Sequence, residues 1–375
     1  MKLMVQNMRG LGRVVVLTIV NFIIVFISIA VIYSVIFSIY TYDRLKVLAE
    51  EEIRAYRQSL LQQRGLSPQA IKKLLETYKE QVYEKYGLNL PVPFRIFYYT
   101  KCLITFNLTG IPTGTNAVYP VSGNNALEVT LNGMARSAIL FTTATIIAIV
   151  IDLLFGIKLA QRAGGLLDKI VATIAMFQNS LPLWWTALIM IMLFAYVIPI
   201  FPSKAEGVEV EIRRLKELNL PFHEYIVRYL AAWIKYMSLP LITIFMVSLL
   251  IGVYGMRTLV LIISREDFVT VARAKGLPER MILYKHILRA ASPPIVTSSL
   301  FSIIGSLGGA LISERIFHWP GAGFVFYLAL AQEDAGVLIV NTWVITLLYL
   351  IAIFALDFIY MLLDPRVRVG KGVEE

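Results

Sequence analysis

Cysteine and histidine are scarce in this chain. Cys102 is the single cysteine, so no intrachain disulfide can form, and the three histidines, His223, His286 and His318, stand far apart. Neither residue type occurs at the short spacings that metal sites use. The sequence therefore predicts a protein with no disulfide and no metal centre of its own.

Charged residues are also few. They make up 16% of the 375 residues, whereas 58% are hydrophobic and the mean hydropathy is +0.70. A soluble domain ordinarily carries about 25% charged residues, so these values predict a protein that crosses a membrane several times. The net charge of +10 would also suit a nucleic-acid-binding protein. The basic residues do not gather on one soluble face, however, so we attribute the charge to membrane topology.

A phosphate-binding loop is missing as well. No Gly-x-x-x-x-Gly-Lys-Ser/Thr motif occurs, and the segment from Gly164 to Lys169 has neither the spacing nor the hydroxyl residue. We therefore expect that this chain does not hydrolyse ATP by such a loop and that it binds no cofactor. The energy for any transport would come from a partner protein or from an ion gradient.

Six apolar stretches are long enough to cross about 30 Å of hydrocarbon as helices. They cover residues 14–40, 137–159, 170–200, 238–262, 294–316 and 338–362. The first is far longer than the roughly 7–15 apolar residues of a signal peptide, and no small-residue cleavage site follows it. We expect an all-α polytopic membrane protein with six transmembrane helices, the first of which stays as an anchor.

The basic residues of the short connecting segments predict the orientation. Segments 1–13, 158–169, 263–292 and 364–375 hold 3, 3, 6 and 3 Lys/Arg, whereas 318–337 holds none and carries Glu333 and Asp334. Because short cytoplasmic loops are enriched in Lys and Arg, both termini are predicted to lie in the cytoplasm. The long segment 41–136 holds twelve basic residues and is still placed outside, since long domains cross largely regardless of charge.

This orientation divides the chain into four parts. Residues 1–40 form a cytoplasmic N-terminus and the first transmembrane helix, 41–136 an extracytoplasmic domain, 137–364 a core with five transmembrane helices, and 365–375 a cytoplasmic tail. The core includes a cytoplasmic loop, 263–292.

The outer segment 41–136 is predicted to contain a helical hairpin. Ser67 and Pro68 are typical of an N-cap and a first helical position, and apolar residues then recur on one face until Gly87. The stretch 45–61 repeats the pattern. Residues 107–125 have the composition of a loop and contain the tripeptide Asn107-Leu-Thr109, a glycosylation sequon.

A second outer segment, about 201–237, carries aromatic residues at helical spacing. Tyr225, Tyr229, Trp233 and Tyr236 suit a helix that lies at the level of the lipid headgroups. We expect an interfacial anchor there.

The loop 263–292 has the features of a docking surface. Small residues at Ala272, Ala274 and Gly276 would let another protein approach closely, and the interspersed basic residues offer contacts to an acidic groove. Gly276 can take a left-handed cap, and Leu277 precedes Pro278 and is thereby driven out of the helical region. The sequence predicts two short helices with a corner between them; an ordinary basic loop is the alternative.

The sequence of this loop also resembles a known family. Its pattern "ARAKG", followed by His286, Arg289 and Pro294, resembles the loop by which ABC importer permeases of the dipeptide/oligopeptide class bind their ATPase subunits. Further signatures occur in the same order: Ser180-Leu-Pro182, the segment from Glu314 to Gly323, Asp334, and the segment from Leu363 to Arg368. The general triplet of ABC importers is replaced by Thr270-Val271-Ala272.

The resemblance implies a permease subunit that is not itself an enzyme. It implies a second homologous permease subunit, two cytoplasmic ATPase subunits that bind ATP and Mg²⁺, an extracytoplasmic solute-binding protein, and transport by alternating access. The implied coupling residues are Thr270, Ala272, Arg273, Ala274, Lys275, Gly276, Leu277, His286, Arg289 and Pro294. The implied residues of the translocation path or gate are Ser180, Pro182, Ser306, Gly309, Glu314, Trp319, Pro320, Gly321 and Asp334.

Several alternatives remain at this stage. Relatives in the resembled family carry peptides, oligosaccharides, nickel or other solutes; peptides come first by family frequency, and nickel is disfavoured because histidine and acidic clusters are missing. An ion-coupled secondary transporter needs no ATPase, but too few charges fall deep in the predicted spans for a proton relay. A membrane-anchored receptor would need neither the small-residue stretch from Gly305 to Ala310 nor the basic inner loop.

Overall fold

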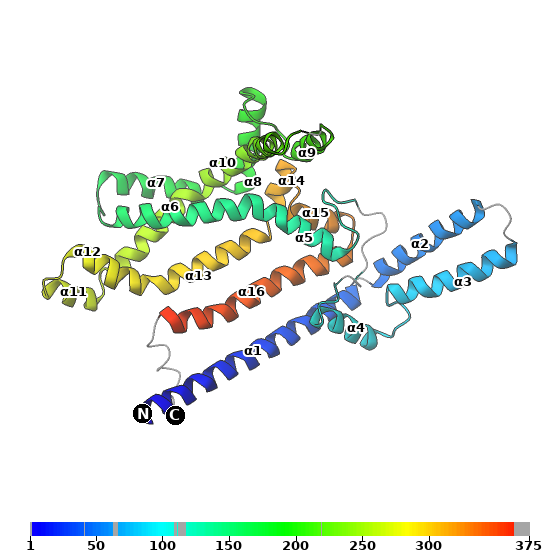
Figure 1. The fold of residues 1–375 in the computed structure, drawn as a ribbon, viewed down its shortest axis with the longest axis horizontal. Helices are drawn as coiled ribbons and strands as arrows, with labels where there is room; N and C mark the ends of the chain where they lie inside the picture. The colour runs from blue at the N-terminus through cyan, green and yellow to red at the C-terminus, as the bar shows by residue number, and fades with distance from the viewer. Residues whose placement is uncertain are drawn as a thin grey trace. The chain divides into compact units, whose positions relative to one another are not determined.

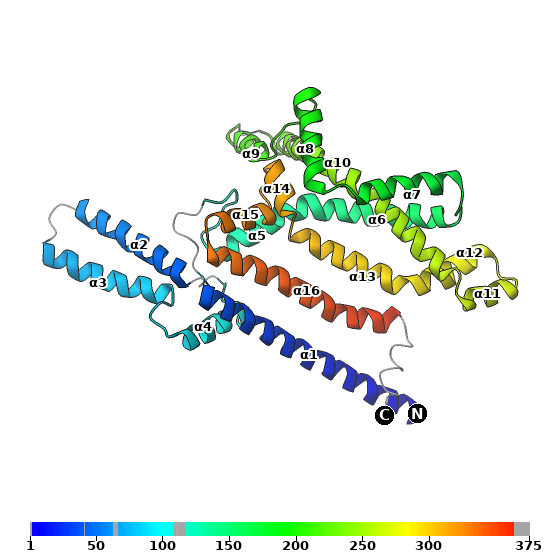
Figure 2. The same ribbon diagram turned by 180° about the vertical axis from the view of Figure 1, so that it is seen from behind.

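The computed structural model describes residues 2–40, 42–62, 67–108, 111, 118–218 and 220–363. Regular structure in these ranges is helical throughout (Figures 1 and 2). Within the described residues, five helices are long and apolar enough to cross a membrane, and a bent helix pair raises the number to six if it counts as one crossing. The terminal signature from Leu363 to Arg368 falls, except for the backbone of Leu363, outside the described residues, as does Thr109 of the sequon.

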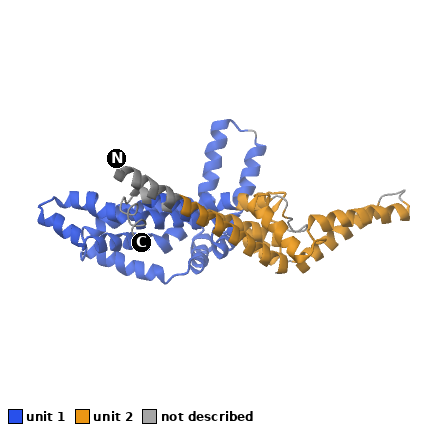
Figure 3. Cartoon of the chain, turned by 90° about the horizontal axis from the view of Figure 1, so that it is seen from below, with its two compact units in different colours: residues 1–7, 134–324, 352–375 blue, residues 8–133, 325–351 orange. Residues whose placement is uncertain are grey.

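The chain forms two compact units (Figure 3). The first, unit 1, comprises residues 1–7, 134–324 and 352–375, and the second, unit 2, comprises residues 8–133 and 325–351. Each unit has its own buried apolar clusters.

Unit 2 combines most of the first long apolar helix with most of the segment 41–136. It contains α1 (Lys2–Tyr40), α2 (Tyr42–Gln62), α3 (Pro68–Lys85) and α4 (Val92–Ile104), and the start of α16 (Ala335–Leu363). One apolar cluster joins residues 30–129 to residues 325–343, with Trp343 and Tyr99 fully buried. Segments far apart in the sequence therefore build one core.

The predicted hairpin is present in unit 2. Ser67 caps α3, since its Oγ accepts from the Ala70 N–H at 3.2 Å, and Gly87, with φ of +65°, ends it. α4 was not anticipated from the sequence. Its Arg95 is 3% exposed and donates to the Ser38 carbonyl at 3.2 Å, which ties α4 to the end of α1.

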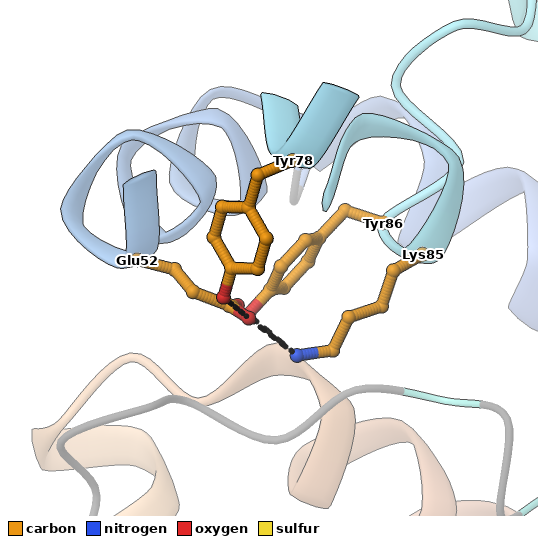
Figure 4. Close-up of polar contacts among 4 residues, drawn as sticks. All are labelled: Glu52, Tyr78, Lys85 and Tyr86. Atoms are coloured by element: carbon orange, nitrogen blue, oxygen red, sulfur yellow. Dashed lines mark hydrogen bonds and ion pairs between the residues drawn. The ribbon is translucent and has the colours of Figure 1, made fainter. Parts of the chain in front are cut away.

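The carboxylate of Glu52 holds the two arms of this hairpin together (Figure 4). It accepts hydrogen bonds from the Tyr78 hydroxyl at 3.2 Å, the Tyr86 hydroxyl at 3.0 Å and the Lys85 ammonium at 3.0 Å. Burial, followed by the charge of Glu52, raises the pKa of Tyr86 well above its ordinary range. One acidic residue on α2 thus organises three side chains of α3 and its C-terminal end.

Unit 1 contains the remaining membrane helices and their connections. In chain order these elements are α5 (Ala126–Ser137), η2 (Ala138–Thr142), α6 (Thr143–Ala160), α7 (Leu166–Asn179), α8 (Leu183–Ile191), η3 (Met192–Val197), α9 (Gly207–Glu217), α10 (Phe222–Ile263), α11 (Asp267–Ala274), α12 (Glu279–Met281), η4 (Ile282–Ile287), α13 (Leu288–Leu307), α14 (Leu311–Phe317) and α15 (Ala322–Ala331). α5 and α15 continue across the boundary into unit 2. α6 and α7 both pack against α10.

Two predicted helix starts are wrong because helices continue beyond the apolar stretches. Residues 126–160 form one 35-residue apolar helix, so the second span does not start at 137. α10 has 42 residues and joins the expected interfacial segment to the expected span 238–262. Its 42 residues correspond to a rise of about 63 Å, roughly twice the thickness of the hydrocarbon core, so α10 is longer than a single membrane crossing requires.

The expected span 170–200 is not one straight helix. α7 and α8 meet at an angle of 93° across Ser180-Leu181-Pro182. Pro182 explains the break, because the residue before a proline is driven out of the helical region.

The expected span 294–316 is shifted. The apolar helix runs from Glu279 to Leu307 and includes Pro293 and Pro294, and Gly309, with φ of +68°, separates it from α14. The small-residue stretch 305–310 is therefore a helix end and a turn rather than a continuous packing face.

Candidate functional site

The short helix α11 has a C-terminus that its sequence defines. Gly276 has φ of +71°, a backbone conformation that glycine adopts without steric cost. The Leu277 N–H donates to the Ala272 carbonyl at 3.4 Å and the Gly276 N–H to the Arg273 carbonyl at 2.9 Å. These two bonds are the Schellman pattern of a helix end. The predicted left-handed cap at Gly276 is confirmed.

An ion pair spans the corner that follows. Arg273 Nε donates to Glu279 Oε1 at 2.8 Å, and Pro278 is the N-cap of α12. The hydrogen bond to Glu279 raises the pKa of Arg273. Beyond the corner, the expected second short helix is instead the start of the long apolar helix that runs from Glu279 to Leu307.

One face of α11 packs on the chain itself. Val269 is fully buried and Ala272 is 5% exposed, and both belong to an apolar cluster with Ile282, Leu283 and Ile287. Ala272 therefore lets α11 lie close to the next helix. It is not part of the surface that another protein could touch.

The opposite face of α11 is exposed. It presents Thr270 and Ala274, and Lys275 at the C-cap of α11 is exposed as well. Phe268 and Val271 are also exposed, by 43% and 52%, and the sequence analysis missed them. Their spacing of three residues, out of phase with Val269 and Ala272, was the signal that could have found them.

A groove of about 720 Å³ lies beside this corner. Its lining comes from the ends of α6 and α10 and from the corner itself: Ala160, Gln161, Val260, Leu261, Ser264, Arg273, Glu279, Arg280, Leu283, Tyr284 and Ile287. Tyr284 is 54% exposed. The groove thus offers an aromatic ring, basic groups and an acidic group around an apolar floor.

The other expected coupling residues lie further along the chain. His286 lies in η4 and is partly buried, whereas Arg289 and Pro294 are exposed on α13. They belong to the helix after the corner and not to α11.

A second site is built around the buried carboxylate of Glu314 on α14. The side chain is 1% exposed and accepts from Ser137 Oγ at 2.6 Å and from the Phe324 N–H at 2.9 Å. Burial raises the pKa of Glu314 to about 7, while these hydrogen bonds act in the opposite direction. α14 lies outside the apolar spanning helices.

Two glycines leave room for this carboxylate. A Cβ placed on Gly309 or Gly321 would come within 2.1 Å and 2.5 Å of the Glu314 oxygens, respectively. Ser137 Oγ also accepts from the Ala322 N–H at 2.8 Å. We call the set of Glu314, Ser137, Gly309 and Gly321 the Glu314 cradle.

Trp319 fixes the loop that follows α14. It is fully buried, and its indole N–H donates to the Arg136 carbonyl at 3.0 Å. Its ring centroid lies 5.8 Å from that of Trp233 on α10. Pro320, next in the chain, is also buried. This loop therefore joins α5, α10 and α14.

The remaining expected path residues are not brought together. Ser306 Oγ lies 2.7 Å from Thr142 Oγ1, and Ser180 and Pro182 form the exposed bend between α7 and α8. Asp334 belongs to unit 2, where its Oδ2 accepts from the Tyr119 hydroxyl at 2.8 Å and its Oδ1 from the Val337 N–H at 3.2 Å. Among the described residues, no three His, Cys, Asp or Glu side chains are grouped so that they could hold a metal ion.

Comparison with known proteins places this geometry in a family. Residues 152–369, more than half of the chain, match the family described as "Binding-protein-dependent transport system inner membrane component". The matched range contains α7, α8, α10, the α11 corner and the Glu314 carboxylate.

Curated relatives match over most of their length. The oligopeptide transport system permease protein AppB of Bacillus subtilis is 28% identical over 296 residues, which cover 79% of this chain and 87% of the relative. The dipeptide transport system permease protein DppB of the same organism is 29% identical over 311 residues, covering 83% and 88%. DppB of Escherichia coli K12 is 29% identical over 242 residues, covering 61% and 69%.

Proposed function

The chain belongs to the family of binding-protein-dependent transport system inner membrane components, and on that premise we propose that it forms half of the translocation path of an ATP-driven peptide importer. A member of this family is a multi-pass protein of the cytoplasmic membrane and a transport component, not an enzyme. Relatives named as dipeptide and oligopeptide permeases support peptide as the solute, ahead of oligosaccharide.

The proposed topology has six crossings. These are α1, α5 with α6, the bent pair α7 and α8, α10, α12 with α13, and α16, with both chain ends in the cytoplasm. The basic residues of the short segments support this orientation. The hairpin of α2 and α3 then stands outside the cell, where a solute-binding protein delivers peptide.

We propose α11 and the adjoining groove as the docking site for a cytoplasmic ATPase subunit. The observation that carries this assignment is the corner at Gly276, because a rigid two-turn helix with an exposed Phe268, Val271 and Lys275 projects there beside a 720 Å³ groove. Two ATPases, which bind ATP and Mg²⁺, and a second permease complete the importer. Closure of the ATPases moves α11 and switches the translocation path between inward- and outward-facing states.

A matched pair of glycine substitutions tests the docking site. Gly276 and Gly164 both have positive φ, and a Cβ at either would meet nothing within 4 Å in this chain. Gly→Gln at each position therefore adds the same bulk and the same backbone strain of roughly 1–2 kcal/mol. Gly276→Gln should abolish peptide uptake and co-purification with the ATPases, whereas Gly164→Gln should retain both. Equal behaviour of the two variants would refute the docking assignment.

A further inference from the structure

The side chain of Gln178, near the C-terminus of α7, forms two hydrogen bonds with the backbone of α10. It is 8% exposed; its Nε2 donates to the Met246 carbonyl at 2.8 Å, and its Oε1 accepts from the Leu250 N–H at 3.1 Å. In a regular α-helix the N–H of residue 250 bonds to the carbonyl of residue 246. The Gln178 amide therefore bonds to both members of one backbone pair of α10, which is a continuous α-helix from Phe222 to Ile263.

The chemistry of the amide suits this position. A glutamine carries a donor and an acceptor side by side, which matches a backbone carbonyl and a backbone N–H one turn apart. α10 also contains the buried Pro240, which has no N–H to offer to Tyr236. The ladder of α10 therefore lacks the bond from residue 240 to residue 236, and Gln178 binds the helix on the C-terminal side of that gap.

The other end of α7 is fastened to α10 as well. Arg257 donates to Asp168 Oδ2 at 2.6 Å, and the two side chains are 18% and 5% exposed. The helical rise puts Asp168 and Gln178 about 15 Å apart along α7. Buried polar contacts at both ends of that length restrain α7 against sliding or turning on α10.

The two fastened helices connect the docking corner to the bend. α10 leads directly into α11, and α7 leads into the 93° bend at Ser180-Leu181-Pro182. We propose that α7 and residues 246–263 of α10 move as one rigid lever during transport, and that Gln178 is the positioning residue that transmits movement of α11 to this bend. This inference rests on the proposed docking function of α11.

Replacement of Gln178 by leucine tests the lever without emptying the site. Leucine is similar in size, and the Leu250 N–H and the Met246 carbonyl still bond to each other within α10, so the fold persists. Asn341→Leu is the matched control, because Asn341 is 2% exposed and its Nδ2 has no hydrogen-bond partner. Both variants are assembled with the partner subunits in proteoliposomes. A radiolabelled alanyl dipeptide is added to the outside solution.

The expected result is uncoupling. The Gln178→Leu chain should co-purify with the ATPases, and the ATPases in that complex should hydrolyse ATP at a rate within twofold of the parental complex. The amount of peptide taken up per ATP should fall at least tenfold. Asn341→Leu should keep the parental ratio. A parental ratio in Gln178→Leu would overturn the lever, whereas failure of the parent chain to bind ATPases would instead overturn the docking function.

A distance measurement gives a second test that does not depend on the solute. Ile174 on α7 and Ile262 on α10 are 41% and 57% exposed. Each can be replaced by a cysteine that carries a spin label. In the parent chain the distance between the two labels should stay the same with and without ATP, and in Gln178→Leu it should broaden. A distance that changes with ATP in the parent chain would show that the two helices move separately and would overturn the proposal.

Discussion

Glu314 and Ser137 lie 177 positions apart in the sequence and are joined by a 2.6 Å hydrogen bond that both residues bury. The Ser137 hydroxyl in turn accepts a hydrogen bond from the Ala322 N–H. One serine at the end of α5 thus binds both α14 and the start of α15. Because Gly309 and Gly321 have no side chains, the carboxylate fits between them. The Glu314 cradle therefore depends on four residues from two separate stretches of the chain, the end of α5 and residues 309–321.

Stability should depend on pH through Glu314. Burial raises its folded-state pKa to about 7, above the ordinary 4.5, so the folded state binds the proton more tightly than the unfolded state. The stabilisation is fully present below pH 4.5 and is lost as the pH rises through about 7. Glu314→Gln removes this titration. Its melting temperature in detergent, compared with that of the parent between pH 5 and 8, should gain at least about 2 °C at the alkaline end; parallel curves would contradict this.

The cradle should not tolerate a methyl group at Gly309. Alanine there must adopt φ of +68° and would place its Cβ 2.1 Å from Glu314 Oε1, so we expect a loss on the order of 1–3 kcal/mol. Gly255 on α10 is the control, since its Cβ would meet nothing within 4 Å and its φ is not positive. Gly255→Ala should keep or slightly raise the melting temperature. Thermal unfolding of both variants checks the prediction, which fails if the two shifts agree.

Glu52 should be the main polar stabiliser of the hairpin formed by α2 and α3. Glu52→Ala leaves two tyrosine hydroxyls and the Lys85 ammonium without their shared acceptor, and we expect local stability to fall on the order of 2 kcal/mol. Amide hydrogen exchange in α3 should then quicken by roughly 30-fold. Glu51→Ala, one position away on α2, is the control; equal exchange in both variants would contradict a special role for Glu52.

The proposed orientation predicts the side from which introduced cysteines react. Gln69 on α3 and Lys285 in η4 are exposed, and the native Cys102 is 4% exposed, so it gives little background. In intact cells an impermeant maleimide should label Gln69→Cys, whereas Lys285→Cys should react only after the membrane is opened. Labelling of position 285 in intact cells would reverse the topology.

Features specified by neighbouring residues could be predicted from the sequence. The cap at Ser67 and the left-handed turn at Gly276 depend on side chains within a few positions, and both predictions are confirmed. The helical class follows from composition, because backbone groups in hydrocarbon must bond within their own segment.

Helix ends and long-range pairs were harder to predict. α10 begins at Phe222, well before the predicted start at residue 238, because the polar residues of its first part lower the hydropathy without breaking the helix. Pro240 also lies inside α10. The cradle around Glu314 needs Ser137 from a distant segment, and Gln178 finds its partners 68 and 72 positions away. No local pattern encodes such pairings.

The core of unit 2 has a consequence for building chimaeras. Its apolar cluster draws on α1, on the segment 41–136 and on residues 325–343. A hydrogen bond joins Tyr119 to Asp334, which lies far away in the sequence. A graft of residues 41–136 from a relative would carry only one part of a shared interior and expose the rest. Exchange of outer domains between permeases of this kind should therefore succeed when the α1 segment and the start of α16 travel with the graft.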